Sequence, residues 1–164
     1  MSSFQRTIRV ILVSGSLTAM ALSSAAPAPA DNRRLNESVF GNIYTAQKMN
    51  GCPVPPQRDG RLDEAARRHA LDLLHHRELN GGIGSDGSTV SDRAAAAGFT
   101  GTVAETIAIN PALAISGIEI LDRWWPDPVS RGTMQDCANI SIGVWSENAL
   151  DRSVVVAVYG QPSL

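Results

Sequence analysis

The stretch from residue 84 to residue 108 constrains the fold most, because it joins a turn, a helix and a strand within a short length of chain. Asp86-Gly87 is typical of a tight turn, since glycine accepts backbone angles that other residues avoid. Ser88 or Thr89 can then cap a short alanine-rich helix over residues 90–97. We expect Arg93, on this helix, to pin the preceding loop through Asp86 or Asp92.

The segment 101–109 follows this helix and alternates in polarity, which is typical of an extended strand with one buried face. Glu105 then shares a face with apolar neighbours, and burying a carboxylate without a partner costs several kcal/mol. We expect Glu105 to accept backbone N–H bonds from the 84–88 loop or to pair with an arginine such as Arg131. The alternative is that burial raises its pKa and makes it a general base.

The first 30 residues predict an export signal. Arg6 and Arg9 precede an apolar run, Val10–Leu22, that is shorter than the roughly 20 residues a membrane span needs. Small residues at Ala28 and Ala30 fit a signal-peptidase site. We therefore divide the chain into a signal peptide, 1–30, and one domain, 31–164, that is secreted or held at the cell envelope, with no stable membrane insertion after cleavage.

Charge argues against a nucleic acid partner. Of the 14 basic residues, two belong to the signal, which leaves 12 against 16 acidic residues in the predicted mature chain. No cluster of lysine and arginine remains that could bind a phosphate backbone.

Two cysteines, Cys52 and Cys137, are the only ones in the chain, and an even count in an exported protein predicts a disulfide. Closing a loop of about 85 residues stabilises a fold by roughly 4–5 kcal/mol in the chain-entropy model. Two buried thiols are the alternative, and a metal site is less favoured because no histidine lies near either cysteine in sequence.

Periodicity divides the rest of the chain into helices and strands. Apolar residues recur at helical spacing over three segments, and an apolar or alternating pattern predicts strands over two segments near the C-terminus. We expect helices over 33–50, 61–78 and 111–125. The apolar stripe of the second helix runs from Leu62 to His76. Asn110-Pro111 supplies the cap and the first residue of the third helix, and Pro126-Asp127-Pro128 stops it. We expect strands over 140–144 and 153–159, separated by a turn at 146–151. Helices packed on an antiparallel hairpin give an α+β layered domain.

The order of these features resembles the CAP superfamily (cysteine-rich secretory proteins, antigen 5, pathogenesis-related 1) in its short bacterial exported form. The residues that carry the resemblance are Leu62-x-x-Ala65-Ala66-x-x-His69-Ala70, Gly84-Ser85-Asp86-Gly87-Ser88, Asp92-Arg93-Ala94-x-x-Ala97-Gly98-Phe99, Ala104-Glu105-Thr106-Ile107-Ala108, Trp124 to Cys137 and Ile142-Gly143-Val144. The resemblance covers nearly all of the predicted mature chain. It implies a three-layer α-β-α sandwich with a small antiparallel sheet, in an extracellular setting.

The same resemblance implies a cleft that in the family holds two histidines and two acidic residues. The first acid matches Glu105 and the second falls near Asp127. The two histidine positions match Gly82 and Ser130, so this chain lacks both imidazoles. A metal ion such as zinc needs three or four ligands, and we therefore expect no metal and no other cofactor.

The remaining candidates for chemistry are few. His76 could stand in for the histidine missing at Gly82, whereas we expect His69 to be a satisfied core residue. We expect Trp124, Trp125 and Trp145 to be core residues rather than a ligand platform. No residue is a confident catalyst, and Glu105 is the one candidate.

The sequence therefore favours an exported binding domain without catalysis, whose ligand the resemblance suggests to be a lipid or another hydrophobic molecule, or whose partner lies in the envelope. One alternative is a peptidase or lipid hydrolase that uses Glu105 with Asp127 or His76. A second is an extracellular surface or host-interaction protein without a small-molecule site.

Overall fold

The computed structural model describes residues 29–163, with side chains from Asn32 onward. The predicted signal peptide lies outside the described residues except for its last two positions. The elements are α1 (Pro29–Met49), β1 (Gln57–Arg58), α2 (Gly60–His75), α3 (Val90–Ala96), β2 (Gly101–Asn110), α4 (Gly117–Trp124), α5 (Pro128–Gln135), β3 (Ser141–Ala149) and β4 (Arg152–Pro162). None of the described helices is long and apolar enough to cross a membrane.

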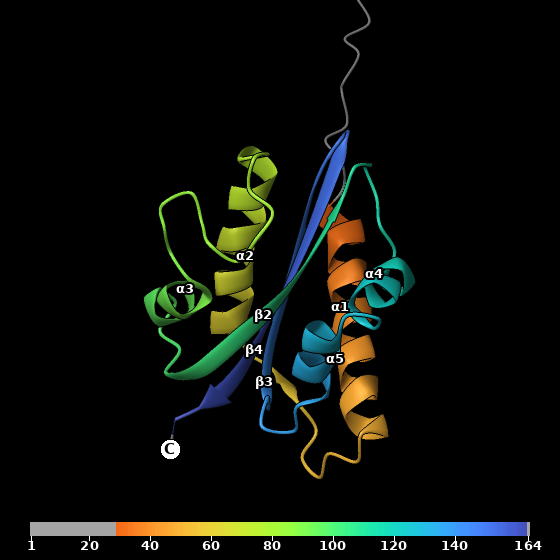
Figure 1. The fold of residues 1–164 in the computed structure, drawn as a ribbon, viewed down its shortest axis with the longest axis vertical. Coiled ribbons are helices and arrows are strands. Elements are labelled where there is room, and N and C mark those ends of the chain that lie inside the picture. The colour runs from red at the N-terminus through yellow and green to blue at the C-terminus, as the bar shows by residue number, and fades with distance from the viewer. Residues whose placement is uncertain (1–28, 164) are drawn as a thin grey trace, which may run out of the picture.

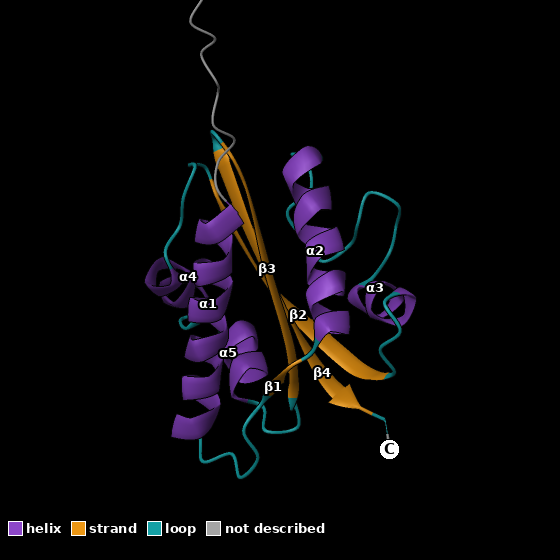
Figure 2. Ribbon diagram, turned by 180° about the vertical axis from the view of Figure 1, so that it is seen from behind, coloured by secondary structure: helices purple, strands orange, loops and turns teal. Residues whose placement is uncertain are grey.

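A four-stranded sheet in the order β1-β3-β4-β2 forms the middle layer. Helices α1, α4 and α5 cover one face, and α2 and α3 cover the other (Figures 1 and 2). The predicted three-layer sandwich is therefore confirmed. The sheet is mixed rather than purely antiparallel, because the short strand β1, which was not predicted from the sequence, pairs with β3 in parallel.

Strand β4 is central and buried on both faces, which explains its continuous apolar sequence. Val154, Val156 and Val158 pack toward α2, whereas Val155, Ala157 and Tyr159 pack toward α1. The Tyr159 hydroxyl and the Thr106 hydroxyl, 2.9 Å apart, hydrogen-bond to each other on the α1 side.

Helix α2 lies directly on the sheet backbone. Its buried stripe contains Leu62, Ala65, Ala66, His69, Ala70 and Leu73. A β-carbon at Gly143 of β3 would overlap the backbone of Leu62, so glycine is required for this approach. The small residues of the stripe bring the helix close, and His69 is thereby held against β2, where the candidate site forms.

The helix predicted over 111–125 begins later than its sequence pattern suggested. Strand β2 continues to Asn110, which pairs with Ser153, and α4 begins only at Gly117. Ser116 and Glu119 form a capping box that satisfies the N–H groups at this start. Asn110 is therefore not the helix cap; its side-chain amide donates to Ala114 O instead.

Two further boundaries differ from the prediction. Asp127-Pro128 does not only stop one helix: Asp127 caps α5, with proline at its first turn, so an additional helix begins there. Strand β3 also continues through the turn predicted at 146–151, because its pairing with β4 runs to Ala149 and Arg152. Only residues 150 and 151 remain for the hairpin turn.

The predicted Cys52–Cys137 disulfide is present, with the two Cα atoms 5.1 Å apart. It joins the segment that follows α1 to the segment that follows α5. The long loop between the cysteines contains α2, α3 and β2, so the bond closes most of the domain into one ring.

The outer edge of β3 is protected by side chains beyond the short pairing with β1. The Val144 amide donates to Asp63 Oδ1 at 2.8 Å, and Arg58 Nη2 donates to the Val144 carbonyl at 3.4 Å. Arg58 also forms an ion pair with Asp63 at 2.7 Å. The peptide groups of Val144 are thus occupied without a further strand.

Candidate functional site

Glu105 projects from the middle of β2 into the layer of α2 and α3. Its neighbours on this face, Val103, Ile107 and Ile109, pack against the apolar cluster under α2, as the alternating pattern predicted. Only 8% of the Glu105 side chain is exposed. A carboxylate in this position requires strong hydrogen-bond donors.

Arg93 of α3 is the main donor to this carboxylate. Its Nη2 atom lies 2.9 Å from Glu105 Oε1 and 3.1 Å from Oε2, and the Arg93 side chain is itself buried. The predicted arginine partner, Arg131, instead donates to Trp125 O. An arginine therefore does pair with Glu105, but it comes from the motif just before β2 rather than from α5.

Arg93 also holds the glycine-rich loop in place. Nη1 donates to the Ser88 carbonyl at 2.7 Å, and Nη2 donates to the Gly82 carbonyl at 3.0 Å. The prediction that Arg93 acts through Asp86 or Asp92 was wrong: it binds the loop backbone and Glu105. Asp86 and Asp92 accept bonds from Ser88 and Thr89, because they close the turn and the capping box of α3.

His69 completes the cluster from α2 and is fully buried. Its Nδ1 lies 3.0 Å from Glu105 Oε2 and 3.0 Å from Arg93 Nη2. Arg93 Nη2 has two hydrogens, which Glu105 and the Gly82 carbonyl already accept, so the contacts favour the tautomer in which Nδ1–H donates to Glu105. The other ring nitrogen, Nε2, has no hydrogen-bond partner. In this tautomer Nε2 carries no hydrogen, so the buried group left unsatisfied is an acceptor rather than an N–H donor. His69 is a core residue, as predicted, but only one of its nitrogens is satisfied.

Gly82 lies against the same carboxylate. A β-carbon at this position would stand 2.8 Å from Glu105 Oε1. The position to which the family's first histidine was assigned is therefore adjacent to Glu105. In this chain the Glu105 carboxylate stands against the space that a β-carbon at position 82 would take.

The other predicted cleft residues are not partners of Glu105. Asp127 caps α5, in the layer of α1, where its Oδ2 accepts from Ser130 N–H at 2.8 Å. Hydrogen bonding by the side chain of Ser130, and then by its backbone N–H, holds the pKa of Asp127 below its usual value. Among the described residues, the hydrogen-bond partners of Glu105 are His69 and Arg93.

His76 caps the C-terminus of α2 and is half-exposed, with 46% of its side chain accessible. Its Nε2 lies 3.6 Å from Asp72 Oδ1, and its Nδ1 lies 3.4 Å from Glu78 Oε1. The histidine therefore contacts acids on the surface, and the prediction that it continues the buried stripe of α2 was wrong.

The cluster offers little chemistry. Both carboxylate oxygens of Glu105 already accept hydrogen bonds, and a guanidinium stands where a cation would need to approach them. No group of three or more histidine, cysteine, aspartate or glutamate side chains within the described part of the chain is arranged to hold a metal ion. The contacts of Glu105 are those of a structural ion pair.

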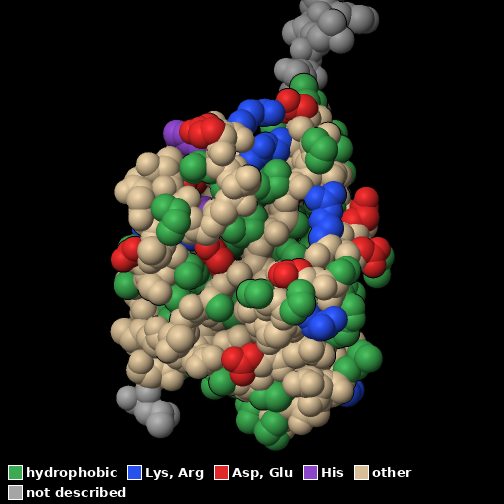
Figure 3. Space-filling model, in the orientation of Figure 1, with side chains coloured by type: hydrophobic (Ala, Val, Ile, Leu, Met, Phe, Trp, Pro, Cys, Tyr) green, Lys and Arg blue, Asp and Glu red, His purple; other side chains and the backbone are tan. Residues whose placement is uncertain are grey.

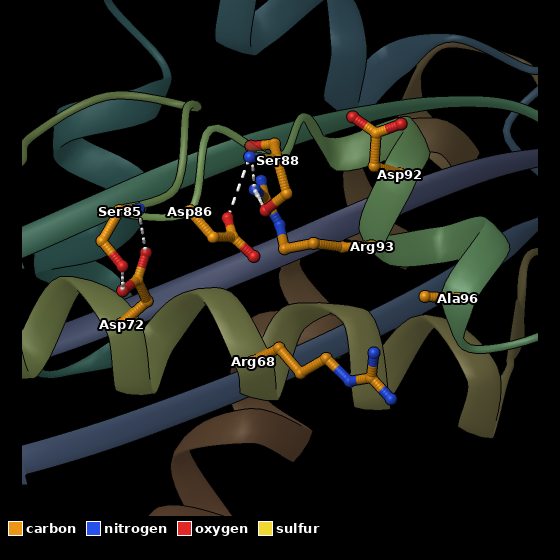
Figure 4. Close-up of a pocket in the computed structure, with 8 residues that line it drawn as sticks. All are labelled: Arg68, Asp72, Ser85, Asp86, Ser88, Asp92, Arg93 and Ala96. Atoms are coloured by element: carbon orange, nitrogen blue, oxygen red, sulfur yellow. Dashed lines mark hydrogen bonds between the residues drawn. The ribbon is translucent and has the colours of Figure 1, made fainter.

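A polar crevice of about 470 Å³ lies beside this cluster, between α2, the 84–88 loop and α3 (Figure 4). There Asp72 accepts hydrogen bonds from both the amide and the hydroxyl of Ser85, and it also faces His76. A nucleophilic triad needs histidine between serine and the acid, whereas here the acid lies in the middle. Burial alone would raise the pKa of Asp72, but the hydrogen bonds from Ser85, together with nearby His76 and His69, outweigh it and lower that pKa, which makes the group a weak base.

A larger and more apolar hollow, which we call the α1 groove, lies at the end of the molecule where α1 begins. Its volume is about 1170 Å³. It is lined by Asn32, Arg33, Asn36, Glu37, Phe40, Arg58, Leu113, Ala114, Trp145, Glu147, Asn148, Ala149 and Leu150. Sequence reasoning missed this site because its residues come from α1, the 111–116 segment and the β3–β4 hairpin.

The tryptophans divide between core and groove. Trp124 is buried and donates through Nε1 to Ile107 O, and Trp125 packs on the same core. Trp145 packs against the apolar cluster under α2, and it also lines the α1 groove and donates to Glu147 Oε1 at 2.8 Å. On the face seen in Figure 3, acidic, basic and hydrophobic side chains are interspersed rather than gathered by charge.

Comparison with known proteins supports the fold. No protein-family model and no curated protein matches the chain. Among solved structures, an outer surface protein of Borrelia burgdorferi is similar, with a TM-score of 0.67 and 16% identity over 77% of this chain and 92% of that one.

Two bacterial structures are also similar but belong to longer chains. An extracellular protein with an SCP domain from Bacillus anthracis has a TM-score of 0.68 and 15% identity over 84% of this chain and 45% of that one. A cysteine-rich secretory protein from Staphylococcus aureus has a TM-score of 0.63 and 12% identity over 82% of this chain and 40% of that one. The chain thus spans less than half the length of these two, and it has the CAP-type fold that its sequence motifs implied.

Proposed function

We propose that this chain is an exported binding domain of the CAP fold that holds a hydrophobic ligand in the α1 groove and has no catalytic role at Glu105. The observation that carries the proposal is the groove itself. Ligand sites in proteins usually have volumes of about 300–1000 Å³, and the α1 groove reaches that size.

The groove is lined by both apolar and polar side chains. Phe40, Leu113 and Leu150 supply apolar surface, and the last two are exposed. Among the polar lining residues, Asn148 Nδ2 donates to Asn32 Oδ1 at 2.8 Å. This combination suits a molecule with an acyl chain and a small polar head, because the chain removes apolar surface from water while the head stays near the amides.

Charge contributes little to this site. Arg33 is paired with Glu37 at 3.1 Å, and Arg58 is paired with Asp63 at 2.7 Å. Since both arginines on the groove already have carboxylate partners, apolar contact has to supply most of the binding free energy. Each buried methylene contributes about 0.8 kcal/mol, so two more methylenes should tighten binding by roughly tenfold.

Export is supported by three observations. The N-terminal 30 residues have the pattern of a signal peptide, and a disulfide joins Cys52 to Cys137. Similar structures are described as outer surface, extracellular or secretory proteins. The mature form recovered from outside the cytoplasm should begin near Asp31 and contain no free thiol.

The test of binding is a titration of the mature protein with straight-chain alcohols of increasing length, followed by tryptophan fluorescence, since Trp145 lines the groove. Affinity should rise by roughly tenfold for each two methylenes until the groove is filled. Leu113→Asp should abolish the response. Ile118→Asp is the matched control, because Ile118 is also an exposed aliphatic residue but lies outside the groove, and it should leave binding unchanged.

Other results would decide between this proposal and its alternatives. If no alcohol binds, or if both variants bind like the natural chain, the groove is not a ligand site and a protein-facing surface role becomes the better explanation. The hydrolase alternative has no geometric support at Glu105, because His69 and Arg93 occupy its oxygens. It would regain support if Glu105→Gln abolished a hydrolytic activity while leaving the fold intact.

A further inference from the structure

Two Asn-Gly pairs occur in the chain, Asn50-Gly51 and Asn80-Gly81, and the structure treats them differently. We infer that Asn80 is a site of spontaneous deamidation, and that the reaction alters the loop that Arg93 holds against Glu105. This inference is independent of the ligand proposed for the α1 groove.

The reaction needs only water. The backbone nitrogen of Gly81 loses its proton to base and attacks Cγ of Asn80, which forms a five-membered succinimide and expels the side-chain nitrogen as ammonia. Water then opens the ring at either carbonyl. The products are aspartate and isoaspartate, and in isoaspartate the main chain runs through the side-chain carbon and gains one methylene.

The surroundings of Asn80 leave this attack unhindered. Asn80 is exposed, and the neighbourhood of Gly81 is open, since an added β-carbon would meet no atom within 4 Å. Among the described residues, no backbone N–H between Leu79 and Gly84 donates to a backbone carbonyl. The Gly81 nitrogen therefore has no hydrogen bond to break before it attacks.

Asn50 provides a control within the same molecule. The Gly51 nitrogen donates to Lys48 O at 3.1 Å, and the Asn50 amide donates to Gln135 O at 3.0 Å. The adjacent Cys52 is fixed by the disulfide. Both reacting groups are thus held by hydrogen bonds that must first break, and the reaction at Asn50 should be slow.

The position of Asn80 links the modification to the candidate site. The carbonyl of Gly82, two residues later, accepts a hydrogen bond from Arg93 Nη2 at 3.0 Å, and Gly82 lies against Glu105. An extra methylene in the main chain at residue 80 shifts this carbonyl relative to Arg93. The isoaspartyl form should therefore have a looser 81–88 loop.

The experiment follows the mature protein during incubation at pH 7 and pH 9, with peptide mapping by mass spectrometry. We expect deamidation at Asn80 to be about tenfold or more faster than at Asn50, the factor that two typical hydrogen bonds supply. The rate at Asn80 should rise with pH, because base removes the Gly81 proton. In reduced protein unfolded in urea, the two sites should react at similar rates.

Asn80→Gln keeps the amide but disfavours ring closure, so it should remove the fast reaction. Amide hydrogen exchange should be faster over residues 81–88 in incubated natural protein than in fresh protein, and unchanged in incubated Asn80→Gln. Equal rates at Asn50 and Asn80 in the folded protein would overturn the assignment of the site. Identical exchange in fresh and fully deamidated protein would overturn its effect on the loop.

Discussion

The buried pair of Arg93 and Glu105 makes a strong prediction about stability. We consider Arg93→Met, which keeps most of the side-chain volume and removes the charge. Glu105 then remains in its buried position with His69 as its only strong donor, and the carbonyls of Gly82 and Ser88 lose their hydrogen bonds as well. The variant therefore leaves a buried carboxylate largely unpaired.

The magnitude follows from the burial of both partners. Removing one member of a buried ion pair typically costs about 3–5 kcal/mol, whereas a whole domain has a free energy of unfolding of about 5–15 kcal/mol. With a urea slope of about 2 kcal/mol per molar, a loss of about 4 kcal/mol lowers the unfolding midpoint by about 2 M. Arg93→Met should thus be among the most damaging single substitutions.

The assay is equilibrium unfolding in urea, followed by circular dichroism. Arg68→Met is the matched control, because Arg68 is an exposed arginine paired with Glu64 on α2, and its loss should cost no more than about 1 kcal/mol. The double variant Arg93→Met/Glu105→Leu should be more stable than the sum of its single variants predicts, by about 1–3 kcal/mol. Additive single effects, or an Arg93→Met midpoint like that of the control, would refute the assignment of this pair as the support of the loop.

Other predictions follow from single features of the fold. A reducing agent should lower the free energy of unfolding by about 4 kcal/mol, because the cysteines Cys52 and Cys137 close a long loop, and an unchanged urea midpoint would contradict this. Gly143→Ala should cost about 3 kcal/mol in the same assay, since its β-carbon overlaps the backbone of α2. Hydrogen bonds from Arg67 and Arg68 lower the pKa of Glu64 from 4.5 to about 2. The ionised carboxylate therefore stabilises the fold fully above about pH 4.5, and this stabilisation is lost as the pH falls toward 2. Glu64→Gln should flatten the dependence of the free energy of unfolding on pH in that window. Excess Zn²⁺ or Ca²⁺ should leave the melting temperature unmoved, because the Arg93 guanidinium occupies the position a cation would need, and a clear upward shift would contradict this.

Much of the architecture was predictable because it depends on local patterns. The stripe of α2, the capped turn before α3 and the apolar run of β4 each lie within a few consecutive residues, and all three were found. The helix start at Gly117 was missed because Asn110-Pro111 also has the residue types of a cap. Pairing of Asn110 with Ser153, distant in sequence, decides against a helix there.

The site was harder to predict, because its contacts depend on tertiary packing. The sequence indicated that Glu105 needs a partner but could not choose among the arginines, and proximity in the fold selects Arg93 over Arg131. The stripe of α2 appeared to include His76, yet the helix ends at His75 and turns that side chain outward. The α1 groove has no local signal, since Phe40, Leu113 and Leu150 come from different segments.

The occupied edge of β3 has a consequence for how this protein behaves among its own copies. An edge strand with open peptide groups is a template on which a strand of another molecule can grow. At Val144 an arriving strand would have to displace the Asp63 carboxylate and the Arg58 guanidinium, and both would lose their hydrogen bonds to the Val144 peptide groups. Arg58 and Asp63 therefore oppose the addition of a further strand at this edge, and with it the growth of fibres from β3.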